Sequence, residues 1–172
     1  MSTPVILTEK LRRPEVLGLA RRRLEGPLLD RSTSRLDLVV APPGSGKTTL
    51  LARVAAAAAE TMPVAWYRVT ADDSSEIALI AHLGRALQKT LGISVAGNST
   101  SALLEALEDW AGPAAMVILD DLHEIAGTAA ERAVQQFIEL RPQHLRVLVG
   151  ARRQPELNIP RLRVSGLSLI HI

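Results

Sequence analysis

The sequence predicts an α/β fold in which helices cover both faces of a mostly parallel sheet. Short apolar runs alternate with helical stretches between residues 36 and 172. The run from Ala114 to Leu119 is unbroken, as expected of a strand that is buried on both faces. A loop rich in Gly and Pro joins the first run, at residues 36–40, to a helical stretch. Since parallel strands need right-handed crossover helices, this alternation indicates a three-layer αβα arrangement.

The composition fits a globular chain and excludes several functions. Of 172 residues, 47% are hydrophobic and only 2% aromatic, so Leu, Val, Ile and Ala must build the core. The absence of cysteine excludes disulfides and thiolate chemistry. A net charge of +2 is too small to indicate nucleic-acid binding by itself. Because no uncharged apolar run reaches about 18 residues and no signal peptide is recognised, we expect a cytoplasmic protein with no membrane contact.

Residues 1–35 are expected to form a basic lead-in or linker, followed by a core over residues 36–172. Pro14 biases Arg13 toward an extended conformation. The stretch from Glu15 to Leu29 is predicted to be helical.

The stretch over residues 36–51 contains a phosphate-binding motif, the P-loop. Residues 41–48 fit the pattern Gly-x-x-x-x-Gly-Lys-Ser/Thr, with Ala41 in the first place. Gly44 and Gly46 allow a positive φ and a close approach of backbone to ligand. Successive N–H groups then form an anion-binding nest at the start of a helix. The alternative is a Gly/Ser turn without a ligand, but the flanking strand and helix favour phosphate binding.

The side chains of this loop predict a bound Mg-nucleotide. Lys47 is expected to reach the β- and γ-phosphates, and Thr48 to place its hydroxyl on Mg²⁺. The residues expected to contact the nucleotide are Pro43, Gly44, Ser45, Gly46, Lys47, Thr48 and Thr49.

The middle of the chain continues the alternation. A helix is predicted from Thr48 to Glu60, where an alanine run has the highest helix propensity, and a strand follows over residues 64–69. A longer helix follows the turn at residues 71–75 and stops at Gly92. Its predicted inner face carries Ile77, Ile80, Leu83, Leu87 and Leu91. A short amphipathic helix is predicted over residues 101–110.

Two acidic residues end the apolar strand at residues 114–121, which is the Walker B pattern. Carboxylates at the carboxyl end of a parallel strand lie where open α/β sheets hold ligands. Asp120 would help to hold Mg²⁺, usually through water, and Asp121 would act as general base on the attacking water. The alternative is a strand that ends in a polar turn, but a P-loop 73 residues upstream favours the catalytic interpretation.

The last third of the chain predicts one helix and two strands. Thr128 and Glu131 form a capping-box signature for a helix that ends before Pro142. A strand over residues 145–151 follows, then an extended loop over 154–160, and residues 167–172 are assigned to a fifth strand.

For Arg152 and for the arginine triplet at residues 21–23, the sequence allows either a functional or a structural role. Arg152 follows the strand at 145–151 and is a candidate sensor of the γ-phosphate, with a surface arginine as the alternative. Arg21, Arg22 and Arg23 cannot all face one way on a helix. They form a solvated basic face, or one of them approaches bound nucleotide or a neighbouring subunit.

Together these motifs resemble the N-terminal nucleotide-binding domain of the STAND-class P-loop ATPases, and more narrowly of the large ATP-binding transcriptional regulators of the LuxR/MalT type. Leu122 is a departure, since the family usually has an aromatic residue there. The resemblance rests on Lys10-Leu11 with Pro14, Arg21-x-Arg23-Leu24, residues 41–51, Val64-Ala65-Trp66, residues 119–125, Ala151-Arg152-x-x-Pro155-x-Leu157 and Leu162-Arg163-x-x-Gly166.

The resemblance implies the strand order of ASCE/AAA-like ATPases, with the Arg152 strand between the P-loop strand and the Walker B strand. It implies that Arg152 is the sensor and that the lead-in around Pro14 and residues 21–23 lies near the adenine. It further implies an ATP/ADP switch between a closed monomer and a self-associating state. DNA contact would come only through domains that this sequence does not carry, so we expect a fragment truncated at its C-terminus.

Three functions compete on this basis. The leading one is ATP binding with slow hydrolysis, as the regulatory switch of a signal-responsive transcriptional regulator. The second is a nucleotide-dependent binding or oligomerisation module with negligible turnover, or an inactive truncated fragment. The third, direct nucleic-acid binding, lacks aromatic residues among the arginines and a helix-turn-helix pattern. Metabolic kinases share the P-loop, but the pair Asp120-Asp121 favours an ATPase.

Overall fold

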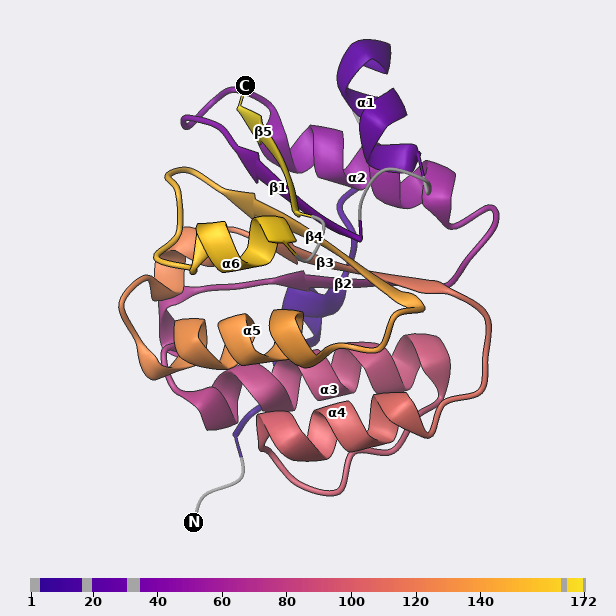
Figure 1. Cartoon of the computed structure of the whole chain (residues 1–172), viewed down its shortest axis with the longest axis vertical. Coiled ribbons are helices and arrows are strands. Elements are labelled where there is room, and N and C mark those ends of the chain that lie inside the picture. Colours follow the sequence, from indigo (N-terminus) through magenta and orange to yellow (C-terminus); the bar gives the residue numbers. More distant parts are fainter. Residues whose placement is uncertain (1–3, 17–19, 31–34, 165–166, 172) are drawn as a thin grey trace.

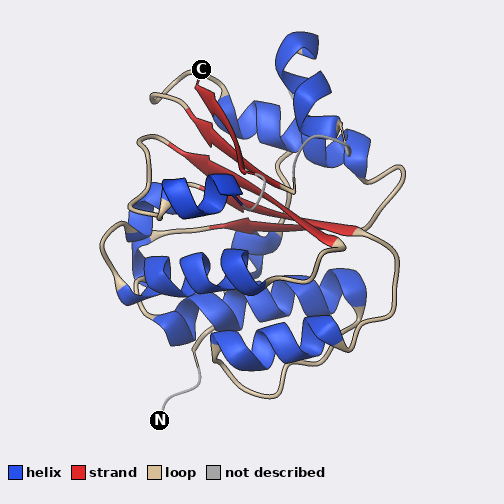
Figure 2. Ribbon diagram, in the orientation of Figure 1, coloured by secondary structure: helices blue, strands red, loops and turns tan. Residues whose placement is uncertain are grey.

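The computed structural model describes residues 4–16, 20–30, 35–164 and 167–171, and helices flank one five-stranded sheet (Figure 1). All strands run parallel, in the order β2-β3-β4-β1-β5 (Figure 2). The fold class and the implied strand order are therefore confirmed. The strands are β1 (Leu36–Val40), β2 (Val64–Arg68), β3 (Ala115–Asp120), β4 (Leu145–Ala151) and β5 (Leu167–His171).

The three central strands are buried at every position, which explains why most of their residues are apolar. β1, β3 and β4 have no exposed residue because helices cover both faces of the sheet. The strand that carries the P-loop and the strand that carries the Walker B pair do not touch. β4 lies between them, in register with both. The residues that follow β4 therefore end up between the two motifs.

Helices fill the crossover connections and form the two outer layers (Figure 1). α1 and α2 cover one face, and α3, α5 and α6 cover the other, with α4 packed outside α3 and α5. The α-helices are α1 (Arg22–Leu29), α2 (Lys47–Ala58), α3 (Glu76–Leu91), α4 (Thr100–Glu108), α5 (Ala129–Leu140) and α6 (Ile159–Val164). The 3₁₀-helices are η1 (Thr8–Leu11), η2 (Ala71–Asp73) and η3 (Leu122–Ile125).

Capping residues fix where the longer helices begin and end. Ser75 accepts a hydrogen bond from the Ala78 amide at the start of α3, and Gly92 ends that helix at φ 73°. Thr128 caps α5 as the capping-box signature predicts, although Glu131 accepts from the Gly127 amide instead of the Thr128 amide.

Three predictions of the sequence are wrong in detail. The first helix begins at Arg22, not at Glu15; residues 14–16 are not helical, and 17–19 lie outside the described residues. Ile77 is exposed, and Leu79 takes its place on the buried face of α3. The loop predicted over residues 154–160 ends earlier, because α6 begins at Ile159. Ile159 and Leu162 of this helix pack against the core.

The segment before α1 is fastened to the edge of the sheet by buried polar groups. The Lys10 ammonium donates to both carboxylate oxygens of Asp73, at 2.9 and 3.0 Å, and both side chains are almost fully buried. The Leu7 amide donates to Nε2 of His82, whose ring stacks on Tyr67 of β2. These contacts hold the chain that leads toward α1 against β2 and α3.

Replacing Lys10 by Met should destabilise the protein, because the buried Asp73 would lose the ammonium group that pairs with it. Loss of one member of a buried ion pair typically costs about 3–5 kcal/mol. Urea unfolding followed by circular dichroism measures this cost, with the exposed Lys89→Met change as control. A loss no larger than that of the control would contradict a buried, paired Lys10.

Candidate functional site

The carboxyl ends of the four strands from β2 to β1 bring the predicted functional residues to one edge of the sheet. β1 leads into the P-loop, β3 into Asp121 and β4 into Arg152. A single cleft is lined by P-loop residues 42–49 together with Arg68, Asp121 and Arg152. Such an edge is where open α/β sheets bind ligands.

The backbone of the P-loop has the geometry that its glycines were expected to provide. Gly44 and Gly46 have φ values of 77° and 79°, and residues with a Cβ atom rarely adopt such values. α2 begins immediately afterwards at Lys47, so its free amide groups point toward the loop. The hydroxyl of Ser45 is buried without a hydrogen-bond partner in the described part of the chain. The loop therefore offers several unpaired donors to an anion.

Lys47 lies at the centre of a buried ion cluster. Its side chain is 6% exposed, and its ammonium donates to Oδ1 of Asp120 and, at 3.0 Å, to Oδ1 of Asp121. Two carboxylates that end one strand thus meet a lysine from the strand–loop–helix unit two strands away. The sequence placed these residues in one site, and the structure brings them into contact.

Asp121 takes a backbone conformation that is uncommon for residues other than glycine. Its φ of 59° and ψ of 35° are left-handed, and no other non-glycine residue in the described ranges has a positive φ. Burial alone would raise the pKa of Asp121, but hydrogen bonds and charge from Lys47 and Arg68 outweigh it and hold that pKa below its usual range. The carboxylate is therefore ionised at neutral pH.

Thr48 and Asp120 provide oxygen ligands that fit Mg²⁺. The Thr48 hydroxyl donates to Oδ2 of Asp120 at 2.7 Å, so a hydroxyl and a carboxylate oxygen already face each other beside the P-loop. Mg²⁺ prefers a few such hard oxygen ligands and keeps several waters. This donor set suits the ion that the P-loop pattern implies.

Arg68 belongs to the site, although sequence analysis missed it. It ends β2, and its Nε donates to Oδ2 of Asp121 at 3.2 Å. β2 lies beside β3, with Arg68 in register with Asp120. The sequence offered one indication of Arg68, a polar residue at the carboxyl end of a predicted strand. Only the strand order shows that this strand lies next to the Walker B strand.

Arg152 lines the cleft, and His123 fixes its backbone. The Arg152 amide donates to Nδ1 of His123 at 3.3 Å, which assigns the ring proton to Nε2. Burial lowers the pKa of His123, while the charges of Asp121 and Glu124 oppose this, so the ring is neutral at pH 7. The 3₁₀ turn after the Walker B strand is thereby connected to the end of β4.

Arg21 also reaches the P-loop. A Cβ added at Gly46 would lie 3.3 Å from Nη2 of Arg21, so the guanidinium packs directly on this glycine. Glu25 holds the arrangement: it accepts from the Arg21 amide at 2.7 Å and from Nε of Arg53 in α2 at 2.6 Å. Of the two alternatives for the arginine triplet, the geometry of Arg21 fits an approach to the ligand site.

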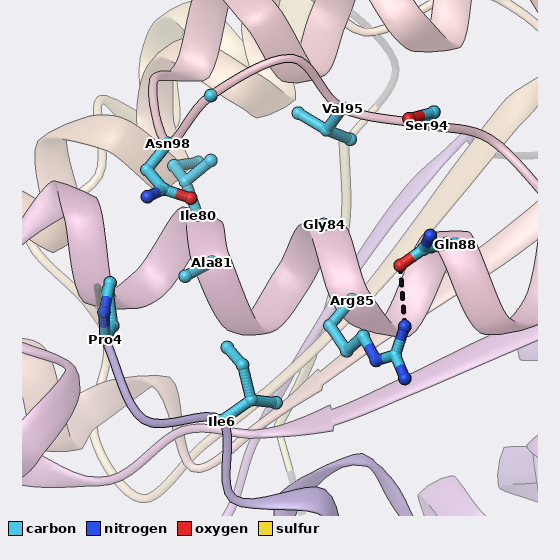
Figure 3. A pocket seen from close by; sticks show the side chains of 11 residues that line it. Pro4, Ile6, Ile80, Ala81, Gly84, Arg85, Gln88, Ser94, Val95 and Asn98 are labelled. Carbon is cyan, nitrogen blue, oxygen red and sulfur yellow. Dashed lines mark hydrogen bonds between the residues drawn. The ribbon is translucent and has the colours of Figure 1, made fainter.

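Another hollow, between the N-terminal segment and α3, lacks comparable chemistry (Figure 3). Apolar residues such as Ile6 and Ile80 line much of it, and its charged residue, Arg85, is bonded to Gln88 at 2.8 Å. No cluster of three or more His, Asp or Glu side chains suited to a metal occurs among the described residues. The cleft at the P-loop is therefore the candidate functional site.

The all-parallel sheet, the P-loop and the two Walker B carboxylates define a P-loop NTPase. Comparison with known families identifies the branch, because residues 30–154 match the family described as the AAA domain. The chain belongs to the AAA domain family.

Regulators of transcription are among its relatives in sequence. The chain is 31% identical over 176 residues to the HTH-type transcriptional regulator MalT of Cronobacter sakazakii, and 30% identical to MalT of Yersinia pestis. Each match covers 93% of this chain but 19% of the relative. The resemblance to regulators of the MalT type is confirmed, and the chain spans about a fifth of their length.

Solved structures share the fold at low sequence identity. Cdc6p from Pyrobaculum aerophilum matches with a TM-score of 0.63 at 17% identity, over 98% of this chain and 49% of that one. AMPPCP-bound DnaA from Aquifex aeolicus matches with a TM-score of 0.50 at 15% identity, over 88% and 44%. In the described part of the chain, no helix has the length and apolar character needed to cross a membrane.

Adding a methyl group at Gly150 should disturb the packing beneath the contact of Lys47 with Asp120. A Cβ there would lie 2.5 Å from Leu51 of α2 and 2.9 Å from Oδ1 of Asp120. We expect Gly150→Ala to cost about 1–3 kcal/mol of stability through overpacking and to weaken nucleotide binding. Thermal unfolding and titration with a fluorescent ATP analogue measure the two effects.

Gly84→Ala is the matched control for this change. Its Cβ would meet Val95 at an ordinary 3.5 Å, and alanine favours helix by about 1 kcal/mol. Equal behaviour of the two variants would contradict the close packing at Gly150.

Proposed function

We propose that this chain binds Mg-ATP and hydrolyses it slowly, as the regulatory switch of a signal-responsive transcriptional regulator. The observation that carries the proposal is the convergence of Lys47 and Thr48, at the head of α2, on Asp120 and Asp121 at the end of β3. The kinship with MalT-type regulators supports the regulatory part. Residues 36–172 would form the nucleotide core and residues 1–35 its lead-in.

Binding would begin with the exchange of one anion for another at Lys47. The buried ammonium is held by the two carboxylates, and the phosphates of a nucleotide would take over part of that role. The P-loop amides and the N-terminus of α2 would hold the β-phosphate, while Arg21 lies close enough to Gly46 to contact the nucleotide.

Hydrolysis needs a general base, a Mg²⁺ ion and a positively charged side chain near the γ-phosphate. Asp121 would orient and deprotonate the attacking water. Thr48 and Asp120 would hold Mg²⁺, which neutralises charge on the phosphates when bound. Arg152, on the same cleft, would contact the γ-phosphate and so distinguish ATP from ADP.

A binding module without turnover is the second candidate. The carboxylate of Asp121 is held by two cations, and a base in such ion pairs is weakly basic. Self-association in the ATP state would then be the output, with DNA contact left to other domains. Turnover decides between the two candidates.

Nucleotide binding tests the first step. The affinity for a fluorescent ATP analogue is measured by titration in the presence of Mg²⁺. Lys47→Ala should lower this affinity by roughly tenfold to a hundredfold, because a hydrogen bond from a charged donor is lost. Lys89→Ala, an exposed lysine on α3, is the control. Circular dichroism checks that each variant folds. Equal affinity of wild type and Lys47→Ala would contradict a phosphate site at the P-loop.

Single-turnover hydrolysis tests the second step. Asp121→Asn keeps the shape of the side chain but removes the base, so the rate should fall by roughly 10²–10⁴-fold while the analogue still binds. Radiolabelled ATP with protein in excess gives the rate. A wild type no faster than Asp121→Asn would reject the ATPase and leave the binding module.

A further inference from the structure

A groove at the outer edge of β2 carries hydrogen-bond donors and charges that the nucleotide site does not use. β2 forms one edge of the described sheet. The lead-in contributes Leu11 and Arg13 to the groove, and α3 contributes Lys89 and Thr90. The volume is about 270 Å³, slightly below the roughly 300–1,000 Å³ of pockets for drug-sized ligands. The groove therefore has room for a small molecule.

The backbone of β2 presents unpaired polar groups at this edge. The amide of Met116 in β3 donates to the Pro63 carbonyl at 2.9 Å, and Val64 is the register partner of Met116. In a parallel ladder a residue bonds to the two residues that flank its register partner, so the backbone groups of Val64 and Trp66 face away from β3. Within the described ranges they have no hydrogen bond on that outer side. Both residues line the groove, and a strand edge of this kind offers N–H donors to a ligand.

The charged side chains at the groove are all positive. Arg13 and Lys89 come from segments far apart in the chain, and neither forms an ion pair in the part of the chain that the structure describes. No Asp or Glu is among the described residues that line the groove, and the hydroxyl of Thr90 adds a further donor. Like charges at one site repel each other unless an anion offsets them. This charge pattern favours a negatively charged ligand.

The rest of the lining is apolar. Leu11, Val64 and Ala86 present hydrocarbon to the groove, and Trp66, which also lines it, is only 4% exposed. Because burial of apolar area is a main source of affinity, an inorganic anion would leave this surface without a matching partner. The ligand that fits carries an apolar body beside its anionic group.

We propose that the groove binds a small organic anion, namely a carboxylate with a short apolar chain. The carboxylate would lie between Arg13 and Lys89 and accept hydrogen bonds from them and from the outward amides of β2. The chain would cover Leu11 and Ala86. The groove shares no lining residue with the cleft at the P-loop, so this proposal does not depend on ATP binding or hydrolysis.

The test titrates hexanoate into the isotope-labelled 172-residue chain without nucleotide and follows the amide NMR shifts. Hexanoate should shift the amides of Val64 and Trp66 saturably, with a Kd in the millimolar range, since so small a ligand makes few contacts. Acetate has the charge without the chain and should bind at least tenfold more weakly, because several methylene groups are no longer buried. Hexanamide has the chain without the charge and should also bind more weakly than hexanoate.

Two charge variants and one control locate the site. Arg13→Ala and Lys89→Ala should each weaken hexanoate binding by about twofold to fivefold, a modest effect because both side chains are exposed. The two changes combined in one chain should weaken it further. Arg85→Ala removes an exposed arginine of the same helix that is bonded to Gln88 outside the groove, and it should leave the affinity unchanged. Circular dichroism checks that each variant folds.

Several results would overturn the proposal. They are the absence of a saturable shift with hexanoate, shifts centred outside the groove, equal affinity for hexanoate and hexanamide, and an affinity that the combined charge variant leaves unchanged. Equal affinity for acetate and hexanoate would show that the apolar lining plays no part and would overturn the assigned ligand class. None of these results bears on the proposed nucleotide switch, because the titration contains no nucleotide.

Discussion

The buried contact of Lys47 with Asp120 and Asp121 is the constraint around which the rest of the site is arranged. A buried ammonium is costly unless it is paired, and so are two adjacent buried carboxylates. Each group therefore needs the others, and they come from opposite sides of β4. The sheet must hold β1 and β3 at a fixed separation for this contact to form.

The packing of β4 satisfies that requirement. Gly150 lies beneath the cluster, where even a methyl group would collide with Leu51 and Asp120. The absence of a side chain lets α2 and the end of β3 approach each other over the middle strand. The choice of glycine at this position is thus explained by the ion cluster above it, not by the conformation of the strand.

The surrounding loops are tied to the cluster through hydrogen bonds rather than through apolar packing alone. Arg152 follows β4 and is linked to the turn after β3 by His123. Glu131 of α5 accepts from the amides of Gly127 and Glu156, which joins the same two loops further out. On the other face, Glu25 connects Arg21 to α2. Hydrogen bonds thus hold three separate segments around the site.

Much of this could be predicted from the sequence. The largely apolar strands, the capping residues and the P-loop and Walker B motifs each depend on neighbours in the chain, so their physical signals are local. Lys47, Thr48, Asp120 and Asp121 could be assigned to one site because motif and strand end together specify the edge of a parallel sheet. The start of α1 and the face of Ile77 were missed, since burial in those places depends on which elements pack nearby.

What only the tertiary structure decided is which strand ends are neighbours. Arg68 and Asp121 lie 53 residues apart in the chain and meet because β2 pairs with β3. Arg21 meets Gly46 because Glu25 and Arg53 join two helices. The sequence by itself determined the fold class and which residues of the P-loop and the Walker B strand share one site. The tertiary structure decided which further charges reach that site, because hydrogen-bonded pairing across the sheet is non-local and leaves no periodic trace in either strand.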